Sequence, residues 1–449
     1  MLLSFLWPGL GQLYVGRRRS GLIFATPAVI LLLLVVWEAR DGADILAARL
    51  LLVPASSLLL VIATIFLAIW RLVSMTAALA DPRAALPRRT RTRLASASWS
   101  REPRRTAVTF AVLAAIVLGT HGLVAWTGLA FLQGFSRVYV GTEPHSTPGP
   151  GATPGDFGVL PTPYSTPQPG GRINVLLIGA DSGLGYAHAL TDTLILVTVD
   201  PQGRTVDMLS LPRDIAEFPL FSGGKFKGKI NALSTYANAH PSQFPDGGLG
   251  TLTREVGYLL GAPVHYYAYL DLAGFKGVVD AIGGVDIINK KQISDSGYGF
   301  PDGKIGFSLP PGPHHLDSRL ALAYARSRNG PGDNDFTRAR RQQELLIAIK
   351  VGLTKPTNLA HLPEILDALA KTVQTDYPAD KLPDLLLLAK QIPEDSVTHL
   401  VLGPPYARQP AVSMGIYELI IDQARFTALS LRIFGADSTF ASPAPSRQP

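Results

Sequence analysis

The stretch INVLLIGADSGLGYAHALTDTLILVTVDPQGRTVDMLSLPRD, residues 173–214, contains three apolar runs separated by turn-forming residues. Runs of this length and composition, ended by glycine or proline, predict buried β-strands over residues 173–179, 193–199 and 205–211. The sequence Asp-Pro-Gln-Gly between the second and third runs predicts a tight turn, so these two strands should form a hairpin. We therefore expect the sheet of a globular domain to begin here.

The predicted hairpin has a consequence for the polar residues that flank it. The start of its first strand and the end of its second share one sheet edge, which should bring Asp192 close to Arg213 and Asp214. If the strand over 173–179 is antiparallel to its successor, Asp181 lies at this edge as well. Two carboxylates and an arginine suit a divalent metal that holds a phosphate. The alternative, which the sequence leaves open, is that these aspartates only form turns.

A second group of polar residues follows in the segment ALAYARSRNGPGDNDFTRARRQQELLIAIK, residues 321–350. Arg326 and Arg328 lie at the end of one predicted helix, and a second helix should begin near Asp335. Spacings of three and four place a set of polar residues on one face of the second helix: Asp335, Arg338, Arg341 and Gln342. The same face continues with Leu345, Leu346 and Ile349, which should pack inward.

Arginines that point toward an interior need an anionic partner, because an unpaired buried charge is costly. Phosphate suits the planar guanidinium, which can bind it through two parallel hydrogen bonds. The spacing is equally compatible with a solvated basic face paired with Asp333, Asp335 and Glu344. The sequence therefore leaves a phosphate clamp and a surface ion-pair network as equal alternatives.

Upstream of the domain, the apolar stretches 21–37, 50–70 and 107–132 are candidates for spanning a bilayer, which needs roughly 20 residues as helix. Arginines precede the first stretch and fill the segment between the second and third. The positive-inside rule places these basic segments in the cytoplasm. We therefore expect a multi-pass protein of the cell membrane, with everything after residue 133 extracytoplasmic. An interfacial or re-entrant helix in place of one span would reverse this orientation.

The distribution of charge argues against a nucleic-acid partner. The net charge is +7, but residues 1–171 hold 15 Lys and Arg against 7 Asp and Glu, whereas residues 172–436 hold 25 against 26. The basicity thus belongs to the apolar part, where it indicates membrane topology. The chain has no cysteine, which excludes disulfides and thiolate metal sites. His314 and His315 follow a proline, so we expect them at a helix start with core or capping roles.

The composition divides the chain into four parts. We expect a membrane region over residues 1–140, a Pro/Gly/Ser/Thr-rich linker over 141–171, a globular domain over 172–435 and a disordered tail over 436–449.

Seven segments of the domain resemble the LytR-CpsA-Psr family of cell-wall proteins, in the family's order. They are INVLLIGAD, TDTLILVTVDP, MLSLPRDI, KINALSTYA, VHYYAYLDLAGFKGVVDAIGGVDI, PGPHHLDSRLALAYARSR and DFTRARRQQ. The resemblance covers residues 172–350 and extends to about residue 435. It implies an α/β fold in which helices flank a mixed β-sheet, with a long apolar pocket for a polyisoprenoid chain and the pyrophosphate at its mouth.

The activity that the resemblance implies is transfer of a glycosyl-1-phosphate from a polyprenyl-pyrophosphate carrier to a hydroxyl of peptidoglycan, assisted by Mg²⁺. Carried over motif by motif, Asp181 and Asp192 would position the metal. Asp335 would orient an arginine or assist the acceptor hydroxyl. The residues that would clamp the phosphates are Arg213, Arg326, Arg328, Arg338 and Arg341, with Gln342 beside them.

Three features depart from the family pattern. Leu190 stands where a basic residue usually precedes the Thr-Asp pair, and Thr337 stands where a glycine is common. The three predicted spans exceed the single anchor typical of members. Two other functions remain open from the sequence: hydrolysis of the same pyrophosphate, and non-catalytic binding of polyprenyl phosphates by a regulator.

Overall fold

The computed structural model describes most of the chain. The described residues are 2–14, 16–42, 46, 49–50, 53–79, 103–138, 167, 171–180, 190–355, 358, 373–378, 381–410 and 417–441. The chain divides into two compact units, one of residues 1–136 and 379–383 and one of residues 137–378 and 384–449.

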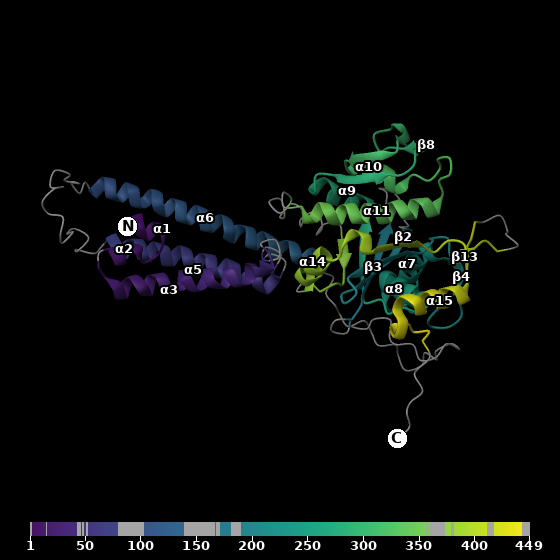
Figure 1. Ribbon diagram of the computed structural model, residues 1–449, viewed down its shortest axis with the longest axis horizontal. Helices are drawn as coiled ribbons and strands as arrows, with labels where there is room; N and C mark the ends of the chain where they lie inside the picture. Colours follow the sequence, from purple (N-terminus) through teal and green to yellow (C-terminus); the bar gives the residue numbers. More distant parts are fainter. Residues whose placement is uncertain are drawn as a thin grey trace, which may run out of the picture. The chain divides into compact units, whose positions relative to one another are not determined.

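The first unit is helical (Figure 1). Its elements are α1 (Leu2–Leu6), α2 (Leu10–Tyr14), α3 (Arg18–Glu38), η1 (Ala39–Asp41), α5 (Pro54–Leu79) and α6 (Pro103–Val138). Three stretches are long and apolar enough to cross a membrane, namely Arg18–Glu38, Ala55–Leu79 and Arg104–Leu129. The three apolar stretches of the sequence therefore all form long helices, as expected.

Specific contacts hold the helices of this unit together. Trp70 Nε1 on α5 donates to the Phe24 carbonyl of α3 at 3.0 Å. The short helices α1 and α2 pack on α5, where Arg71 donates to the carbonyls of Phe5 and Leu6, both at 2.7 Å. These bonds satisfy carbonyls at the end of α1 that have no partner within the helix.

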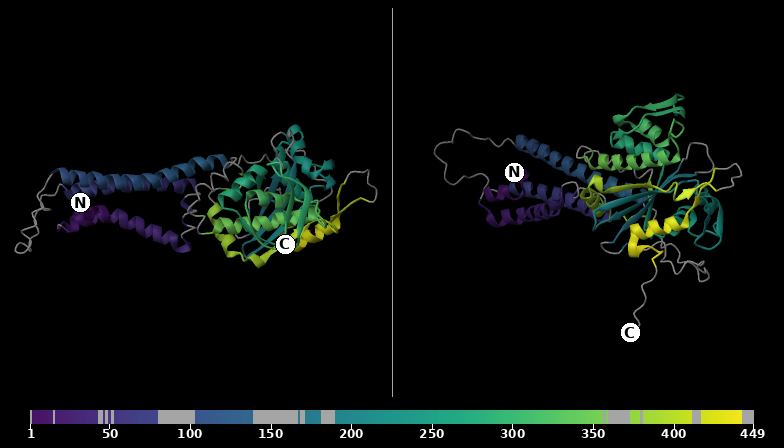
Figure 2. Two further views of the ribbon diagram at one scale, coloured as in Figure 1. Left: turned by 90° about the horizontal axis from the view of Figure 1, so that it is seen from above. Right: turned by 45° about the vertical axis from the view of Figure 1, so that its right-hand side comes forward.

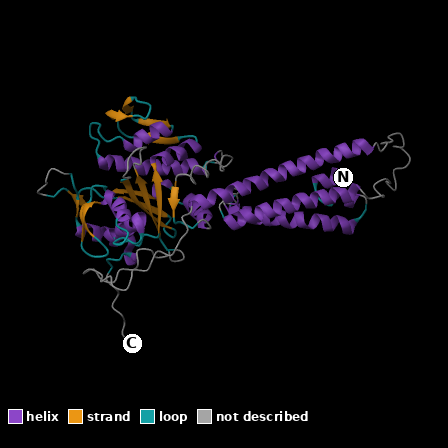
Figure 3. Ribbon diagram, turned by 180° about the vertical axis from the view of Figure 1, so that it is seen from behind, coloured by secondary structure: helices purple, strands orange, loops and turns teal. Residues whose placement is uncertain are grey.

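The second unit is built on a six-stranded mixed sheet (Figure 3). In spatial order its strands are β11 (Val373–Thr375), β6 (Tyr266–Asp271), β1 (Ile173–Ala180), β2 (Thr191–Asp200), β3 (Thr205–Ser210) and β12 (Val397–Val401). Strand β1 is antiparallel to β2 and parallel to β6, and β2 forms a hairpin with β3. The predicted hairpin is confirmed. The antiparallel pairing of the first two strands, on which the placement of Asp181 depended, is present as well.

Helices cover both faces of the sheet. The helices described after residue 171 are α7 (Ile230–Ala239), α8 (Gly247–Leu260), α9 (Leu272–Ala281), α10 (Ser318–Arg326), α11 (Asp335–Thr354), α14 (Leu382–Gln391) and α15 (Gln423–Phe434). Helices α7, α8 and α15 pack on one face, against side chains such as Leu176 and Leu196. The other face, with Ile195 and Met208, packs against Leu346 of α11 and Leu388 of α14. The domain is therefore α/β with a mixed sheet between helical layers, as expected.

A smaller lobe contains α9 and α10 and packs on the side of α11 that faces away from the sheet (Figures 1 and 2). Its strand pairs are β7 (Val285–Asn289) with β10 (Gly312–Leu316), and β8 (Ile293–Gly299) with β9 (Ile305–Leu309). The remaining pairs of the second unit are β4 (Ala216–Pro219) with β5 (Lys225–Lys229), and β13 (Ala407–Arg408) with β14 (Ile420–Ile421). Short 3₁₀ turns are η4 (Glu394–Ser396) and η5 (Gly435–Asp437).

Two expectations need correction. His314 and His315 lie in strand β10, not at a helix start, because the segment pairs with β7; His315 Nδ1 lies 2.7 Å from Asp286 Oδ1. The packed chain also continues beyond residue 435, the predicted end of the domain. Ser438 is buried and bonds to Ser430, and the Thr439 amide donates to the Gly261 carbonyl at 2.9 Å. The linker over 141–171 lies almost wholly outside the described residues.

Candidate functional site

One edge of the sheet gathers the polar residues that follow or precede its strands. Ala180, the last residue of β1, pairs with Thr191 of β2 and with Asp271 of β6. Arg213 follows β3 at the same edge, and its Nη1 donates to Asp192 Oδ1 at 2.7 Å. The hairpin therefore brings Asp192 and Arg213 together, as expected. Asp181 lies outside the described residues.

Asp271 is a further carboxylate at this edge that the sequence analysis missed. It ends β6, and its side chain caps α9 by accepting a hydrogen bond from the Gly274 amide at 2.7 Å. It lines the same cavity as Asp192. The sequence signal was available, since the apolar run YYAYL at residues 266–270 ends at this aspartate. The position of this strand beside β1 could not be predicted, because the parallel pairing of β1 with β6 joins segments about 90 residues apart.

The arginines come from the junction between α10 and α11. Helix α10 ends at Arg326, as predicted, and α11 begins at Asp335. Asp335 Oδ1 lies 3.0 Å from Arg338 Nη1, 3.3 Å from Arg328 Nη1 and 4.0 Å from Arg213 Nη2. One carboxylate thus lies among three guanidinium groups from three segments of the chain.

Burial and repulsion between neighbouring guanidinium groups act against the positive charges at this junction, and nearby carboxylates favour them. Arg338 is 7% exposed, and burial, with repulsion from Arg213 and Arg328, lowers its pKa despite the attraction of Asp335 and Asp192. Burial also opposes the charge of Arg213, but Asp192, Asp335 and Asp214 outweigh it and leave its pKa raised. The Nε groups of Arg213 and Arg338 are buried without a hydrogen-bond partner in the described part of the chain. Unsatisfied buried donors of this kind need an acceptor.

Arg341 and Gln342 have different positions. Arg341 is buried, but it does not line the cavity: its Nη1 pairs with Asp333 Oδ1 at 2.8 Å, and its Nη2 donates to the Ser327 carbonyl. Arg341 therefore fixes the α10–α11 connection. Gln342 lines the cavity, and its Nε2 lies 3.3 Å from the Ala325 carbonyl. Neither alternative describes the whole face: Arg338 is buried at the cavity, whereas Arg341 pairs with Asp333 but is buried rather than solvated.

A second missed residue, Asp295, holds the segment that carries Arg328. It lies on β8, is 1% exposed, and its Oδ2 accepts hydrogen bonds from Ser327 Oγ at 3.0 Å and from the Arg328 and Asn329 amides at 3.2 Å. Burial alone would raise the pKa of Asp295, but these hydrogen bonds hold it below its usual range. The contacts span more than 30 residues, so no local pattern could have revealed them.

The arginine-lined edge opens into a cavity of about 410 Å³, within the range of about 300–1,000 Å³ typical of ligand sites. Its wall is apolar and includes Leu177 and Ile195 of the sheet, Phe275 of α9, Leu322 of α10 and Leu346 of α11. Its polar lining consists of Asp192, Thr193, Arg213, Asp271, Arg326, Arg328, Arg338 and Gln342. The cavity therefore suits a ligand with an apolar body and an anionic end.

The described residues at this edge supply only part of a Mg²⁺ site. Magnesium is usually bound by one or two carboxylates together with substrate phosphates and water. Asp192 Oδ1 accepts a hydrogen bond from Arg213, which leaves Oδ2 as its other oxygen that a metal could bind. Among the described residues, no group of three His, Asp or Glu side chains could hold a metal. A metal site here would therefore depend on ligand oxygens and on residues outside the described ranges, Asp181 among them.

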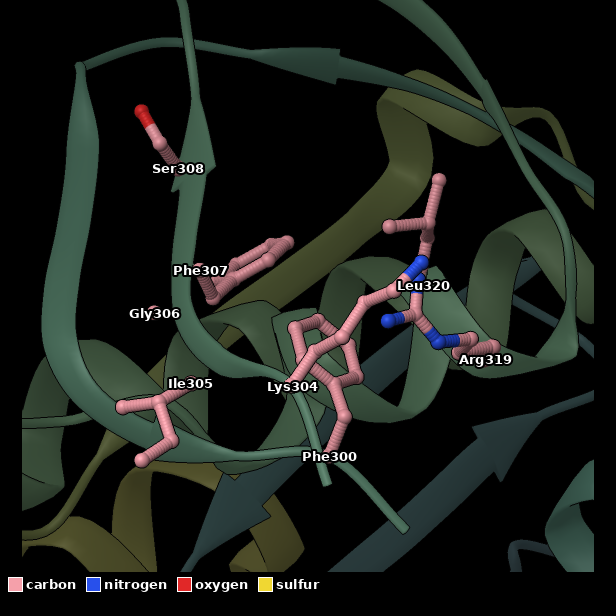
Figure 4. A pocket seen from close by; sticks show the side chains of 8 residues that line it. All are labelled: Phe300, Lys304, Ile305, Gly306, Phe307, Ser308, Arg319 and Leu320. Atoms are coloured by element: carbon pink, nitrogen blue, oxygen red, sulfur yellow. The ribbon is translucent and has the colours of Figure 1, made fainter. Parts of the chain in front are cut away.

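A second cavity, of about 420 Å³, lies between β9 and the start of α10 (Figure 4). It shares no lining residue with the first. The Arg319 guanidinium lies 3.7 Å from the centre of the Phe300 ring and 3.2 Å from Asp302 Oδ2, and Lys304 also pairs with Asp302. Its cations are already matched by a carboxylate, so it offers a weaker site for an anion than the arginine mouth.

The chain is similar to several known proteins. Residues 160–430 match the LytR_cpsA_psr family. The polyisoprenyl-teichoic acid–peptidoglycan teichoic acid transferase TagU of Bacillus mycoides is 29% identical over 213 residues, 47% of this chain and 63% of TagU. The protein of the same name from Oceanobacillus iheyensis is 32% identical over 217 residues, 48% of this chain and 62% of its own length. The match thus spans less than two thirds of either relative.

Solved structures are also similar. The crystal structure of B. subtilis TagV is 23% identical, covers 61% of this chain and 100% of its own, and has a TM-score of 0.48. TagT bound to LIIa-WTA is 26% identical, covers 60% of this chain and 91% of its own, and has a TM-score of 0.45. Because the family match covers more than half of its length, the chain belongs to the LytR-CpsA-Psr family.

Proposed function

We propose that the chain is a membrane-anchored phosphotransferase that moves a glycosyl-1-phosphate from a polyprenyl-pyrophosphate carrier to a hydroxyl of peptidoglycan. The observation that carries this proposal is the apolar cavity with a mouth of four arginines. In the described part of the chain, the buried Nε groups of Arg213 and Arg338 make no hydrogen bond, although Arg213 Nε lies 3.8 Å from Asp214 Oδ2. A polyprenyl pyrophosphate has the matching chemistry, an apolar chain that ends in a diphosphate. The names of the TagU relatives describe a polyisoprenyl-linked donor and a peptidoglycan acceptor for those proteins.

In the proposed reaction, the acceptor hydroxyl oxygen attacks the phosphorus that carries the sugar. A new P–O bond forms, the bond to the bridging oxygen breaks, and polyprenyl monophosphate leaves with the electron pair. The hydroxyl proton is released to water. Such transfers depend on positioning and charge neutralisation rather than on a covalent enzyme intermediate. Guanidinium groups suit this task because they bind phosphate oxygens in fixed geometry.

Each residue at the mouth has a role in the proposal. Arg213, Arg328 and Arg338 bind the diphosphate oxygens, and Arg326 and Gln342 line the same entrance. Asp335 contacts Arg328 and Arg338, so it orients these groups. Arg341 acts indirectly, through its bond to the Ser327 carbonyl. Asp181 and Asp192 would hold Mg²⁺, which when bound supplies further neutralisation of phosphate charge.

The membrane placement is part of the proposal. The three long apolar helices support anchoring, and the arginine-rich segment between the second and third supports a cytoplasmic position for that segment. The catalytic unit then faces the cell wall, where its acceptor lies.

The test uses the full chain in detergent with a polyprenyl-pyrophosphoryl disaccharide, Mg²⁺ and a soluble peptidoglycan fragment, followed by mass spectrometry. A phosphoglycan adduct that is lost with EDTA and in Asp192→Ala supports the transferase. Free phosphorylated sugar without an adduct would instead establish a hydrolase. Tight lipid binding without turnover across several carrier lipids would establish a non-catalytic binder and overturn the proposal.

A further inference from the structure

In the proposed reaction, the acceptor must approach the diphosphate from outside the lipid cavity. The turn over residues 212–215 carries Arg213, which faces the cavity, and Asp214, which does not line it. Asp214 Oδ1 accepts a hydrogen bond from Lys229 Nζ at 2.6 Å. A role for this turn in acceptor binding rests on the proposed transferase function.

A segment from the end of the chain lies directly beside this turn. Leu419 bridges to Ile215 in parallel register, the Leu419 amide donates to the Asp214 carbonyl at 2.9 Å, and the Ala216 amide donates to the Leu419 carbonyl at 3.0 Å. Tyr417 precedes Leu419 by two residues and is therefore held next to the turn. Strands β4 and β14, which flank these positions in the sequence, are also in contact.

The side chain of Tyr417 is accessible to a ligand from solvent. Its side chain is 44% exposed, and it does not line the lipid cavity. Burial, then the charges of Asp214 and Asp335, raise the pKa of its phenol, so both carboxylates lie within electrostatic reach of the hydroxyl. Tyr236, the other exposed tyrosine of the described domain, has its ring stacked on His240 at 4.0 Å. No other described ring stacks on Tyr417.

We infer that Tyr417, with Asp214 and Lys229, forms the subsite for a pyranose ring of the acceptor glycan. A pyranose presents an apolar C–H face that packs on an aromatic ring, and hydroxyls that bond to carboxylate and ammonium groups. The subsite lies beside Arg213, on the outer side of the mouth. It orients one acceptor hydroxyl toward the phosphorus while the lipid remains in its own cavity.

The test separates acceptor binding from donor binding. The full chain in detergent is assayed with a polyprenyl-pyrophosphoryl disaccharide and a soluble oligosaccharide of the peptidoglycan glycan strand, and KM is measured for each. Tyr417→Ala should raise the acceptor KM about fivefold, the loss expected for one stacking contact, and change the donor KM by less than about twofold. Tyr417→Phe keeps the ring and should restore the acceptor KM. Tyr236→Ala is the matched control.

The outcomes distinguish the inference from the function on which it rests. An unchanged acceptor KM in Tyr417→Ala, with normal thermal stability and normal transfer, would overturn the subsite and leave the transferase standing. An equal rise in both KM values would assign Tyr417 to the donor and also overturn it. Absence of adduct in the wild type, under conditions where the lipid binds, would overturn the transferase itself.

Discussion

At the scale of single residues, the arginines of α11 divide into groups with different tasks. Arg338 is buried at the cavity, Arg341 is buried within the α10–α11 connection, and Arg340 between them is exposed. The difference follows from helical geometry, since positions 338 and 341 share a face that position 340 does not. Arg340 can therefore serve as a control for Arg338, because both are arginines of the same helix and only Arg338 lines the cavity.

Arg338→Ala should lower kcat/KM for transfer about 10²–10³-fold, the effect of removing one preorganised donor from a developing oxyanion. Arg340→Ala removes the same side chain from the same helix without touching the cavity and should leave kcat/KM within about twofold. Steady-state kinetics of both variants, with thermal unfolding as a check on folding, measure this. Equal losses in the two variants would contradict the assignment of Arg338 to the mouth.

Asp295 should act on the reaction through Arg328. Asp295→Asn weakens the three hydrogen bonds that fix residues 327–329, and we expect about a tenfold loss of kcat/KM. A double-mutant cycle with Arg328→Ala measures the coupling between Asp295 and Arg328. The double variant should have the same kcat/KM as Arg328→Ala alone. Additive losses would show that Asp295 has only a structural role.

At the scale of elements, the start of α11 explains one departure from the family pattern. Thr337 forms a capping box with Asn334: the Asn334 side chain accepts from the Thr337 amide at 3.0 Å, and Thr337 Oγ1 accepts from the Asn334 amide at 2.9 Å. Thr337 Oγ1 also donates to Asp333 Oδ1 at 3.0 Å. The residue that replaces the usual glycine therefore stabilises the helix that presents Arg338.

Thr337→Gly should destabilise the domain by about 1–2 kcal/mol, because it removes the cap and places glycine in the first turn of the helix. Chemical denaturation of the full chain in detergent, following the domain transition, measures the free energy of unfolding. Thr337→Ser keeps the hydroxyl and should recover most of the loss. A neutral Thr337→Gly would mean that the capping box contributes nothing.

Helix α8 carries a buried carboxylate with a pH-dependent effect on stability. Burial raises the pKa of Glu255 to about 7, although hydrogen bonds from the Phe221 amide and Arg254 act against this rise. The unfolded chain binds fewer protons than the native state between about pH 4.5 and 7, so stability is lost as pH rises through this window, by up to about 3 kcal/mol. Thermal unfolding at pH 5 and pH 8 measures the slope. Glu255→Gln should flatten it, and an unchanged slope in that variant would contradict the assignment.

The sequence predicted those elements whose signal is local. The apolar runs between residues 173 and 211 predicted β1, β2 and β3, because strands buried on both faces are continuously apolar. The spacing after residue 335 predicted the buried face of α11. Asp271 and Asp295 were missed because their surroundings come from distant segments. His314 and His315 were misassigned because Pro313 suggested a helix start, whereas pairing with β7 made the segment a strand.

At the scale of the whole molecule, the proposed function requires the arginine-rich segment before residue 106 and the second unit to lie on opposite sides of the membrane. The chain has no cysteine, so single cysteines report topology without a background. In intact cells, a membrane-impermeant maleimide should label Ser222→Cys, on an exposed turn of the second unit, and should not label Ser98→Cys, in the arginine-rich segment, until the cells are permeabilised. The reverse pattern would place the catalytic unit in the cytoplasm and contradict the proposed acceptor.

The central claim is that the arginine mouth catalyses attack at phosphorus rather than at the sugar. The most direct measurement identifies the lipid released when the full chain acts on a polyprenyl-pyrophosphoryl glycan and a peptidoglycan fragment. The account predicts polyprenyl monophosphate, in equal amount to a glycan adduct that retains one phosphate. Release of polyprenyl pyrophosphate with a phosphate-free adduct would show attack at the sugar and contradict it.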